Sequence, residues 1–227
     1  MSMIAERALE LISDGAVVGL GTGRAATAFV RALGARVKTG LRVRGIATSE
    51  ATARLATELG IPLASFADVD SIDIDVDGAD EVDERLDLIK GYGGALVREK
   101  IVAAASKRVV ILVSREKLVS ALGARGRLPV EVVPFGLRFC ARRLGELGLS
   151  PTPRTEGGRP FLTDNGNHIL DCALAAIPSP EDLERRIISI PGVVGTGLFL
   201  GMADTVLIED GASVEVRQRE PTERRMA

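Results

Sequence analysis

The chain has 227 residues, of which 46% are hydrophobic and 26% charged, as in a soluble globular protein with one large domain or one domain and a smaller insertion. Its net charge of −2, from 29 basic and 31 acidic residues without a basic patch, argues against nucleic acid as a partner. The first helical segment carries Glu6 and Glu10 and is no signal peptide, and no apolar run reaches the roughly 18 residues of a membrane span, so no membrane partner is expected.

Few side chains other than carboxylates and lysines offer chemistry. Cys140 and Cys172 lack metal-binding spacing, and two free thiols fit a protein of the reducing cytoplasm. His168 is the only histidine, and beside Asn and Gly it is expected to have a structural role in a turn. Catalysis is therefore expected to depend on carboxylates, lysines and backbone amides.

The first half of the chain alternates helix-like and strand-like segments. Helices are predicted over 3–13, from the glycine-rich turn after residue 20 to about 38, from the N-cap Ser49 to Gly60, and over 93–106. Strands are predicted over 17–20, 42–47, 71–77, 86–89 and 109–113. This alternation is typical of parallel βαβ units and predicts an α/β fold with a wound parallel sheet.

The pattern changes after residue 127. Strand 130–133, helix 137–147, a polar turn region over 150–160, strand-like 161–162 and 168–171, helix 180–188 and strand 193–199 follow in this order. The order β-α-β-β-α-β predicts a second, smaller α+β domain of the split-βαβ, ferredoxin-like kind over 128–199. Strand 203–209 is expected to rejoin the first sheet, so that 1–127 and 200–227 form one domain. The polar tail from Val214 is expected to fray.

The segment VVGLGTGRAATAF ends the first predicted strand, and ligands of wound sheets bind at the carboxyl ends of the strands. Gly21 and Gly23 let backbone amides approach an anion at the start of a helix. With Ala26 they also fit the dinucleotide pattern G-x-G-x-x-A. The next strand ends in Thr48-Ser49-Glu50, without the terminal acid expected for a ribose, which favours a phosphate cradle without nucleotide. A tight turn without a ligand is the third interpretation.

The segment DVDGADEVD contains five carboxylates in nine residues. Asp73 and Asp75 alternate with apolar residues, as on a half-buried strand, and they are interpreted as solvated together with Asp83. Asp77 and Asp80 differ because they bracket a Gly-Ala turn at the strand end. They are expected to point into the ligand crevice.

The segment LIKGYGGALVREKIVAAA places Lys90 before a glycine-rich loop and a helix, which is a second place to hold an anion. Glu99 shares a helix face with Leu96 and Ala103, and a carboxylate in an apolar crevice binds a proton more tightly, as a general base requires. The alternative is that residues 98–100 form a solvated helix face. Carboxylates, a lysine and two anion cradles together suit a small phosphorylated polyol and proton transfer next to a carbonyl.

In these segments the sequence resembles the ribose-5-phosphate isomerase family of type A. The resemblance is carried by GLGTG (19–23), TSEAT (48–52), DVDGADE (75–81), ALVREK (95–100), SREK (114–117), LPVEVVPF (128–135), DNGNHILD (164–171) and PGVVGTGLF (191–199). It implies a Rossmann-like domain with a smaller α+β domain, assembled as a homodimer or homotetramer. It also implies interconversion of D-ribose 5-phosphate and D-ribulose 5-phosphate without a metal or organic cofactor.

The resemblance further assigns roles to single residues. Glu99 matches the base that moves a proton between C1 and C2 through an enediolate. Asp77, Asp80 and Lys90 match polar residues that assist ring opening and stabilise the developing oxyanion. The substrate contacts that it implies are Thr22, Gly23, Arg24, Ala25, Gly78, Ala79, Gly91, Tyr92, Gly93 and Lys117.

Two positions depart from the family pattern. The family usually reads T-G-S-T after the first strand, where this chain has Arg24 and Ala25 in the last two places. Arg24 either clamps the phosphate bidentately or points outward. The lysine loop usually continues in glycine, where this chain has its only tyrosine, Tyr92. That side chain either narrows the pocket or rests on the surface, so both departures concern the sugar more than the reaction type.

Rival hypotheses come from three directions. A sugar-phosphate sensor would carry a helix-turn-helix and could dispense with the base, yet few residues precede the first strand and Glu99 is present. A nucleotide-dependent oxidoreductase would use the G-x-G-x-x-A pattern to bind NAD. An isomerase of another phosphorylated sugar would keep the same residues.

Overall fold

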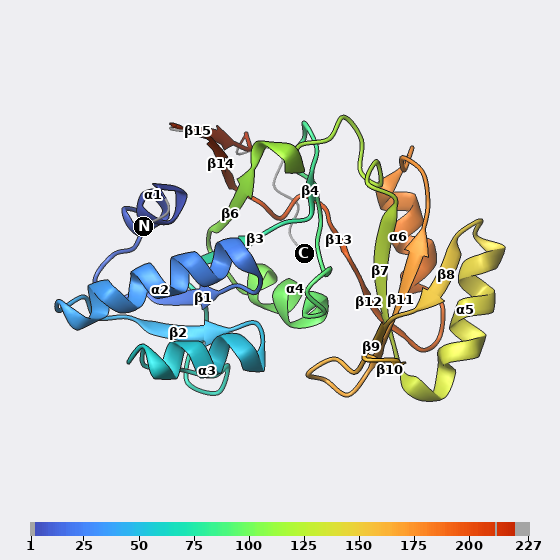
Figure 1. Ribbon diagram of the computed structural model, residues 1–227, viewed down its shortest axis with the longest axis horizontal. Coiled ribbons are helices and arrows are strands. Elements are labelled where there is room, and N and C mark those ends of the chain that lie inside the picture. The colour runs from blue at the N-terminus through green and yellow to red at the C-terminus, as the bar shows by residue number, and fades with distance from the viewer. Residues whose placement is uncertain (1–2, 212, 221–227) are drawn as a thin grey trace. The chain divides into compact units, whose positions relative to one another are not determined.

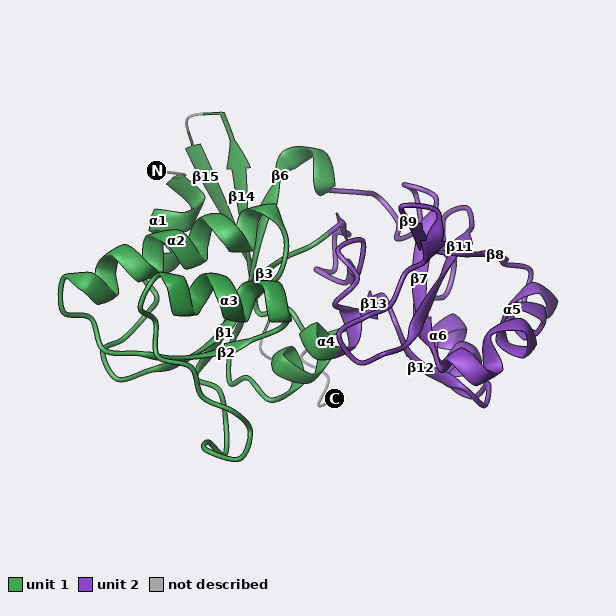
Figure 2. Ribbon diagram, turned by 60° about the horizontal axis from the view of Figure 1, so that its bottom comes forward, with its two compact units in different colours: residues 1–79, 98–117, 201–227 green, residues 80–97, 118–200 purple. Residues whose placement is uncertain are grey.

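The computed structural model describes residues 3–211 and 213–220. The chain forms two compact units, each built from more than one stretch of sequence (Figure 2). Unit 1 comprises residues 1–79, 98–117 and 201–227, and unit 2 comprises residues 80–97 and 118–200. The two units are defined by their compactness and not by independent folding. The domains expected from the sequence, 1–127 with 200–227 and 128–199, therefore stay a prediction.

Within the described residues, unit 1 is built on a six-stranded sheet (Figure 1). The strands are β1 (Val17–Leu20), β2 (Arg44–Ala47), β3 (Ile74–Gly78), β6 (Val109–Ser114), β14 (Thr205–Asp210) and β15 (Ser213–Gln218), in the spatial order β2-β1-β3-β6-β14-β15. The first five run parallel, and β15 is antiparallel to β14. The parallel strands have the 2-1-3-4-5 order of flavodoxin-like wound sheets, in which ligands bind where the order reverses, between the first and third strands. The predicted wound α/β fold is confirmed.

Helices cover both faces of this sheet (Figure 1). On one face lie α1 (Met3–Leu9) and α2 (Arg24–Lys38), with α3 (Glu50–Glu58) packed against α2 and β2. Val18 of β1 and Phe29 of α2 belong to the core cluster of this face. The other face carries α4 (Leu96–Ala104), whose Val102 clusters with Val17 of β1. A parallel sheet buried on both faces explains why its strands are nearly continuous apolar runs.

Unit 2 contains a four-stranded antiparallel sheet with two helices. Its elements are β7 (Arg127–Val132), α5 (Leu137–Glu146), β8 (Ser150–Pro153), β11 (His168–Ala173), α6 (Pro180–Ile188) and β12 (Val193–Thr196). The spatial order is β12-β7-β11-β8, with antiparallel pairing throughout. This is the split-βαβ, ferredoxin-like arrangement that the element order predicts. Leu128, Val130 and Val132 alternate along β7 and point into the core of unit 2.

Shorter elements complete the two units. They are β4 (Glu81–Val82), β5 (Leu88–Ile89) and β13 (Leu198–Phe199), which form a three-stranded sheet of unit 2, the hairpin of β9 (Thr155–Glu156) and β10 (Arg159–Pro160), and the 3-10 turns η1 (Arg115–Lys117) and η2 (Pro134–Gly136).

Several predicted segments differ from the structure. The first four residues of the polar turn region over 150–160 form strand β8, and the predicted strand 161–162 is not one. The segment of β8 contains two prolines, which are typical of turns, so the sequence did not predict a strand there. The prolines are tolerated because β8 is an edge strand. The tail expected to fray pairs with β14 over 213–218, while residues 221–227 lie outside the described residues. The predicted strand 193–199 is split into β12 and β13 at Gly197.

Two smaller expectations concern the membrane and the thiols. Among the described helices, none combines the length and the apolar character that crossing a membrane demands. Cys140 and Cys172 are both buried as free thiols, as their spacing predicts. Burial raises the pKa of the Cys172 thiol to about 12.

Candidate functional site

The loop after β1 lies directly against the end of β3 in unit 1. The Gly21 amide donates to the carbonyl of Val76 at 3.1 Å, and the Thr22 amide donates to Asp77 Oδ1 at 3.0 Å. The same carboxylate oxygen accepts the Gly78 amide at 2.7 Å. A Cβ on Gly21 would lie 2.6 Å from the Asp77 Cα atom, so only glycine permits this approach. The two strand ends that flank the reversal of strand order are therefore joined through Asp77.

The start of α2 offers backbone amides without a capping side chain. Gly23 precedes the helix with φ 104° and ψ −179°, a conformation open essentially to glycine alone. The first turn contains no acidic residue, and the first intrahelical bond runs from the Thr27 amide to the Gly23 carbonyl at 2.8 Å. The amides of the first turn have no acceptor inside a helix, so this end of α2 attracts an anion. Arg24, the first helical residue, is exposed, and Ala25 lies next to Gly78.

A cluster of hydrogen-bonded hydroxyl groups packs against this loop. Thr22 Oγ1 lies 2.7 Å from Thr48 Oγ1 and 2.9 Å from Ser49 Oγ, and Thr52 Oγ1 donates to the Gly21 carbonyl at 3.0 Å. Ser49 also caps α3 by accepting the Thr52 amide at 3.1 Å, as predicted. Sequence reasoning missed the cluster, although the motif TSEAT carried the signal. The Thr22 side chain is turned into this cluster while its backbone contacts Asp77.

The carboxylates of β3 face the side of the sheet that α4 covers. Ile74 and Val76 belong to the core cluster under α2, so the alternating Asp75 and Asp77 point to the opposite face. Both are almost fully buried, each with 1% of its surface exposed. The interpretation of Asp75 as a solvated residue is therefore wrong.

Asp77 and Glu99 share this face and one edge of the sheet. A Cβ on Gly19 would lie 2.5 Å from Asp75 Oδ1 and 2.7 Å from Val102 Cγ1, so Asp75 and Val102 meet over β1. Since α4 connects the parallel strands β3 and β6, it runs back along the sheet, and its N-terminal end lies toward the carboxyl edge. Glu99, one turn before Val102 and 4% exposed, therefore lies on the Asp77 side of that contact. The alternative of a solvated helix face is wrong for Glu99.

Two further carboxylates of the acidic segment have structural partners. Asp83 was expected to be solvated, but it is only 9% exposed and accepts amides of its own turn, including that of Asp87 at 2.9 Å. Burial, reinforced by the charge of Asp87, raises the pKa of the Asp83 carboxyl despite these hydrogen bonds. Asp73 is the partly exposed member, and it accepts a hydrogen bond from Lys107 Nζ at 2.8 Å. Only for Asp73 does the solvated interpretation hold.

Asp80, Lys90 and the glycine-rich loop that follows Lys90 lie on unit 2. Lys90 is 3% exposed, and its amide donates to the Gly197 carbonyl at 2.9 Å. The Tyr92 amide donates to Asp80 Oδ2 at 2.9 Å, so the loop backbone and Asp80 are joined directly. Gly91 has φ 101° and Gly94 has φ 87°, which side chains rarely adopt. Gly93 completes the predicted set on this unit, whereas the half-buried Ala79 belongs to unit 1.

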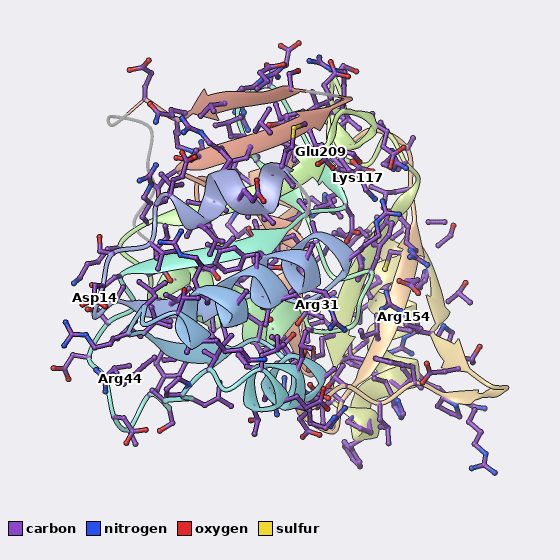
Figure 3. All side chains as sticks on the ribbon, turned by 60° about the vertical axis from the view of Figure 1, so that its left-hand side comes forward. Asp14, Arg31, Arg44, Lys117, Arg154 and Glu209 are labelled. Carbon is purple, nitrogen blue, oxygen red and sulfur yellow. The ribbon has the colours of Figure 1, made fainter. Side chains whose placement is uncertain are left out.

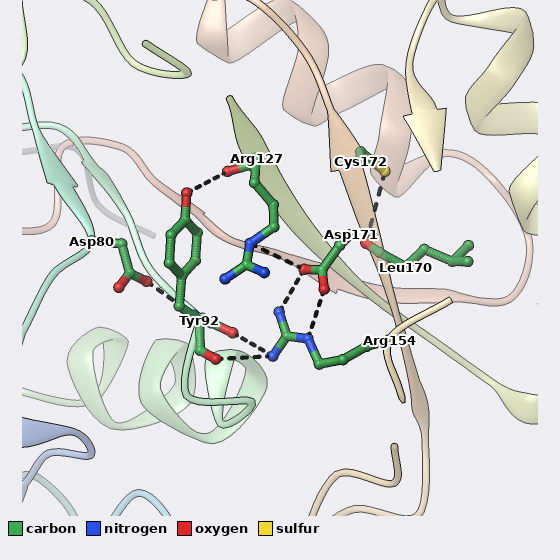
Figure 4. A network of polar contacts seen from close by, with 8 residues as sticks. Asp80, Tyr92, Arg127, Arg154, Leu170, Asp171 and Cys172 are labelled. Carbon is green, nitrogen blue, oxygen red and sulfur yellow. Dashed lines mark hydrogen bonds and ion pairs between the residues drawn. The ribbon is translucent and has the colours of Figure 1, made fainter. Parts of the chain in front are cut away.

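The side chain of Tyr92 faces the four-stranded sheet of unit 2 (Figure 4). Its hydroxyl donates to the Arg127 carbonyl at 3.1 Å, and the Arg127 guanidinium lies 4.0 Å from its ring centroid. Burial, followed by the charges of Glu81 and Asp80, raises the pKa of the Tyr92 hydroxyl. Tyr92 is thus half-buried, and it is its backbone amide that meets Asp80. The surface alternative is wrong.

Other residues of interest are more peripheral. Lys117 ends η1 and is half-buried (Figure 3). Glu81 is fully buried and accepts the amides of Gly123 at 2.6 Å and Arg125 at 2.8 Å, a loop anchor that sequence reasoning missed. His168 Nδ1 lies 2.9 Å from the Phe161 carbonyl, which agrees with a structural role. Over residues 3–211 and 213–220, no group of three or more His, Cys, Asp or Glu side chains could hold a metal ion.

Comparison with known proteins identifies one family. The family model described as ribose 5-phosphate isomerase A (phosphoriboisomerase A) matches residues 44–212. The ribose-5-phosphate isomerase A of Thermomicrobium roseum is 54% identical over 95% of this chain and 92% of its own length. The solved ribose 5-phosphate isomerase A of Methanocaldococcus jannaschii is 40% identical, with a TM-score of 0.90 over 95% of this chain and 96% of that one. A solved D-ribose-5-phosphate isomerase in complex with phospho-erythronic acid is 38% identical, with a TM-score of 0.92 over the same shares.

Proposed function

Since the chain belongs to the ribose 5-phosphate isomerase A family, we propose that it interconverts D-ribose 5-phosphate and D-ribulose 5-phosphate through an enediolate. The observation that carries the proposal is the placement of two buried carboxylates, Asp77 and Glu99, at the sheet edge where the uncapped start of α2 also lies. The solved relative that holds phospho-erythronic acid, a phosphorylated sugar acid, supports a substrate of this class.

Glu99 is the base of the proposed reaction. It removes the proton from C2 of the open-chain aldose, the electron pair forms the C1–C2 double bond, and the C1 carbonyl oxygen becomes the oxyanion. A proton then passes from O2 to O1, Glu99 returns its proton to C1, and the carbonyl remains at C2. One base suffices because C1 and C2 are adjacent, and a positioned base contributes about 10²–10⁴-fold to such a step.

The remaining polar residues have complementary roles. The ammonium group of Lys90 offsets the charge of the oxyanion, because an enediolate needs a cation or donor at its oxygen. Asp77 and Asp80 accept and return hydroxyl protons during ring opening and during the exchange between O1 and O2. The backbone through Gly78 and Ala79, and through Gly91 to Gly93, lies beside these side chains in the sequence.

The phosphate is held by the start of α2. The amides from Gly23 to Ala25 and the positive end of the helix dipole supply the attraction, and Thr22 is fixed by its hydroxyl cluster. Arg24 adds a guanidinium that can donate two parallel hydrogen bonds to a phosphate. Lys117 supplies a further contact with the substrate.

One direct experiment tests the function. The purified protein is incubated with ribose 5-phosphate in buffer with EDTA, and the appearance of a ketopentose phosphate is measured. Conversion in EDTA is expected, since the proposed mechanism uses neither a metal nor an organic cofactor. The C2 epimer of the substrate and a six-carbon aldose phosphate serve as comparison substrates. Absence of ketopentose, or preference for a comparison substrate, would contradict the proposal.

The family resemblance also suggests where and how the protein works. We place it in the cytoplasm, where a sugar phosphate substrate and two free thiols are both expected. We further propose a homodimer or homotetramer, because unit 2 leaves Phe135 fully exposed, with Val133 and Phe139 also exposed beside it. Light scattering coupled to gel filtration distinguishes either assembly from a monomer.

A further inference from the structure

Arg154 follows β8 and lies in a polar network on unit 2 (Figure 4). Its side chain is only 12% exposed, and it makes a bidentate pair with Asp171 of β11, through Nε at 2.9 Å and Nη2 at 2.6 Å. Asp171 also lies 3.6 Å from Arg127 Nε, and Arg127 stacks on Tyr92. The paired carboxylate fixes the orientation of the Arg154 guanidinium, because a planar fork bound twice cannot rotate.

The remaining donor of this guanidinium holds the Lys90 loop. Arg154 Nη1 donates to the Gly91 carbonyl at 3.0 Å and to the Tyr92 carbonyl at 3.2 Å. The amide of the same Tyr92 donates to Asp80 Oδ2 at 2.9 Å. The connection from Asp171 to Asp80 therefore passes through one guanidinium and one residue of backbone. Lys90 is the residue immediately before the two anchored carbonyls.

We propose that Arg154 is a positioning residue for isomerisation: held by Asp171, it fixes the backbone at Gly91 and Tyr92 and thereby the placement of Asp80 and Lys90. The inference rests on the proposed function. A loop with two left-handed glycines has little stiffness of its own, so an external anchor is needed to hold side chains within a fraction of an ångström. Tyr92 contributes a second anchor, through its ring under Arg127 and its hydroxyl on the Arg127 carbonyl.

The test compares Arg154→Met with Arg159→Met. Arg159 lies on the adjacent β10 and is exposed, so its substitution controls for loss of one positive charge in this region. Arg154→Met should lower kcat about 10- to 100-fold, the usual cost of misplacing catalytic groups by about 1 Å. KM for ribose 5-phosphate should stay within about twofold, because the phosphate is held elsewhere. Amide hydrogen exchange of a peptide over residues 90–95 should become faster in Arg154→Met and unchanged in Arg159→Met.

A conservative variant separates positioning from a general loss of structure. Lysine in Arg154→Lys can reach either Asp171 or the loop carbonyls but not both, so kcat should fall between the values of Arg154→Met and the parent protein. If Arg154→Met does not fold, the lysine variant decides by the same two readouts. Parental kcat and parental exchange over 90–95 in a folded variant would overturn the proposal. So would a raised KM at unchanged kcat, since this would make Arg154 a substrate contact.

The activity of the parent protein keeps the two proposals apart. If the parent protein does not isomerise ribose 5-phosphate, the proposed function fails, whatever the variants do. If the parent is active and Arg154→Met matches it in kcat, only the positioning role fails.

Discussion

At the scale of single residues, the proposed reaction depends on Glu99 as the base. The residue is 4% exposed and lies on a helix that covers the Asp77 face of the sheet. Glu99→Gln keeps the size and shape of the side chain but removes its capacity to take a proton. We expect kcat to fall about 10²–10⁴-fold, the usual contribution of a general base. Steady-state assays with ribose 5-phosphate measure this, and circular dichroism checks that the fold is retained.

The matched control for Glu99→Gln is Glu58→Gln. Glu58 lies at the end of α3 in the same unit and is exposed, so its neutralisation should leave kcat unchanged. A Glu99→Gln enzyme with near-parental turnover would assign the proton transfer to another residue. Equal losses in both variants would point to the net charge of unit 1 instead.

Substitution of Arg24 tests how the proposed site holds a phosphate. It is exposed at the first position of α2, beside the backbone amides that are proposed to bind the phosphate. Arg24→Ala should raise KM about 3- to 10-fold, up to the roughly 1.4 kcal/mol that a tenfold change represents, with kcat little changed. Arg31→Ala, an exposed change farther along the same helix (Figure 3), should not alter KM. An unchanged KM for Arg24→Ala would leave the phosphate to the amides alone.

The sequence locates Asp77 and Gly21 correctly at neighbouring strand ends, because a motif and a strand end coincide there, and their roles toward a substrate stay predictions. It fails at Asp75 because alternation with apolar neighbours looks the same on a half-exposed strand and on a central strand buried on both faces. It leaves Tyr92 open because the partner of its ring, Arg127, is 35 residues away in the chain. Tertiary partners of this kind leave no local periodicity.

At the scale of elements, the loop between β1 and α2 depends on the absence of a side chain at Gly21. A methyl group there would lie 2.1 Å from Asp77 Oδ1 and 2.6 Å from the Asp77 Cα atom, so the two strand ends must separate. Gly21→Ala should lower the free energy of unfolding by about 1–3 kcal/mol, as overpacking does, and reduce activity as well. Urea unfolding followed by circular dichroism measures the change.

Gly145→Ala is the control, because it should change the free energy of unfolding in the opposite direction. Gly145 lies in the last turn of α5, and a Cβ there would have no neighbour within 4 Å. Alanine should therefore raise the free energy of unfolding by about 0.5–1 kcal/mol through helix propensity, without changing activity. Equal stability of Gly21→Ala and the parent protein would show that the β1–α2 loop can move away from Asp77.

Most element types were predictable from periodicity, whereas β8 and the element edges were not. The helix expected over 3–13 ends at Leu9, because hydrogen-bonded turns replace it before Asp14-Gly15. The sequence over 150–153 contains two prolines and reads as a turn, yet it forms β8 at the edge of the sheet, where a missing donor costs least. This segment is a strand because it pairs with β11, which is distant in the sequence.

At the scale of the whole molecule, the order of elements predicted both folds correctly. Alternation of strands and helices indicated the parallel sheet of unit 1, and β-α-β-β-α-β indicated the ferredoxin-like sheet of unit 2. The assignment of 80–97 to the second compact unit was not visible in the sequence, because β5, which pairs with β4, also pairs with β13 more than 100 residues later. Asp80 and Lys90 thus belong to the unit that carries Arg154 and Asp171.

The decrease in the free energy of unfolding at alkaline pH should depend on Tyr92. The folded state raises the pKa of this hydroxyl above its ordinary value of 10.0, mainly through burial, so the fold favours the neutral form. This contribution is complete below pH 10 and is lost as the pH rises through the higher folded pKa. Phenylalanine has no hydroxyl to ionise, so Tyr92→Phe does not lose this stability at high pH. The parent protein does lose it, and the difference in unfolding free energy between parent and variant should therefore shrink above pH 10.

An absorbance titration and a stability comparison check this, and the titration is simple to read because the chain has one tyrosine and no tryptophan. Near-ultraviolet absorbance of the folded parent should show a tyrosinate midpoint above 10, and the urea-unfolded chain should titrate near 10.0. Near neutral pH, Tyr92→Phe should be less stable by about 1 kcal/mol, because the hydrogen bond to the Arg127 carbonyl is lost. A folded-state midpoint at the unfolded value, with parallel stability curves for parent and variant, would mean that Tyr92 is exposed in solution. Arg127 would then not stack on it, and the Lys90 loop would rely on Arg154 alone.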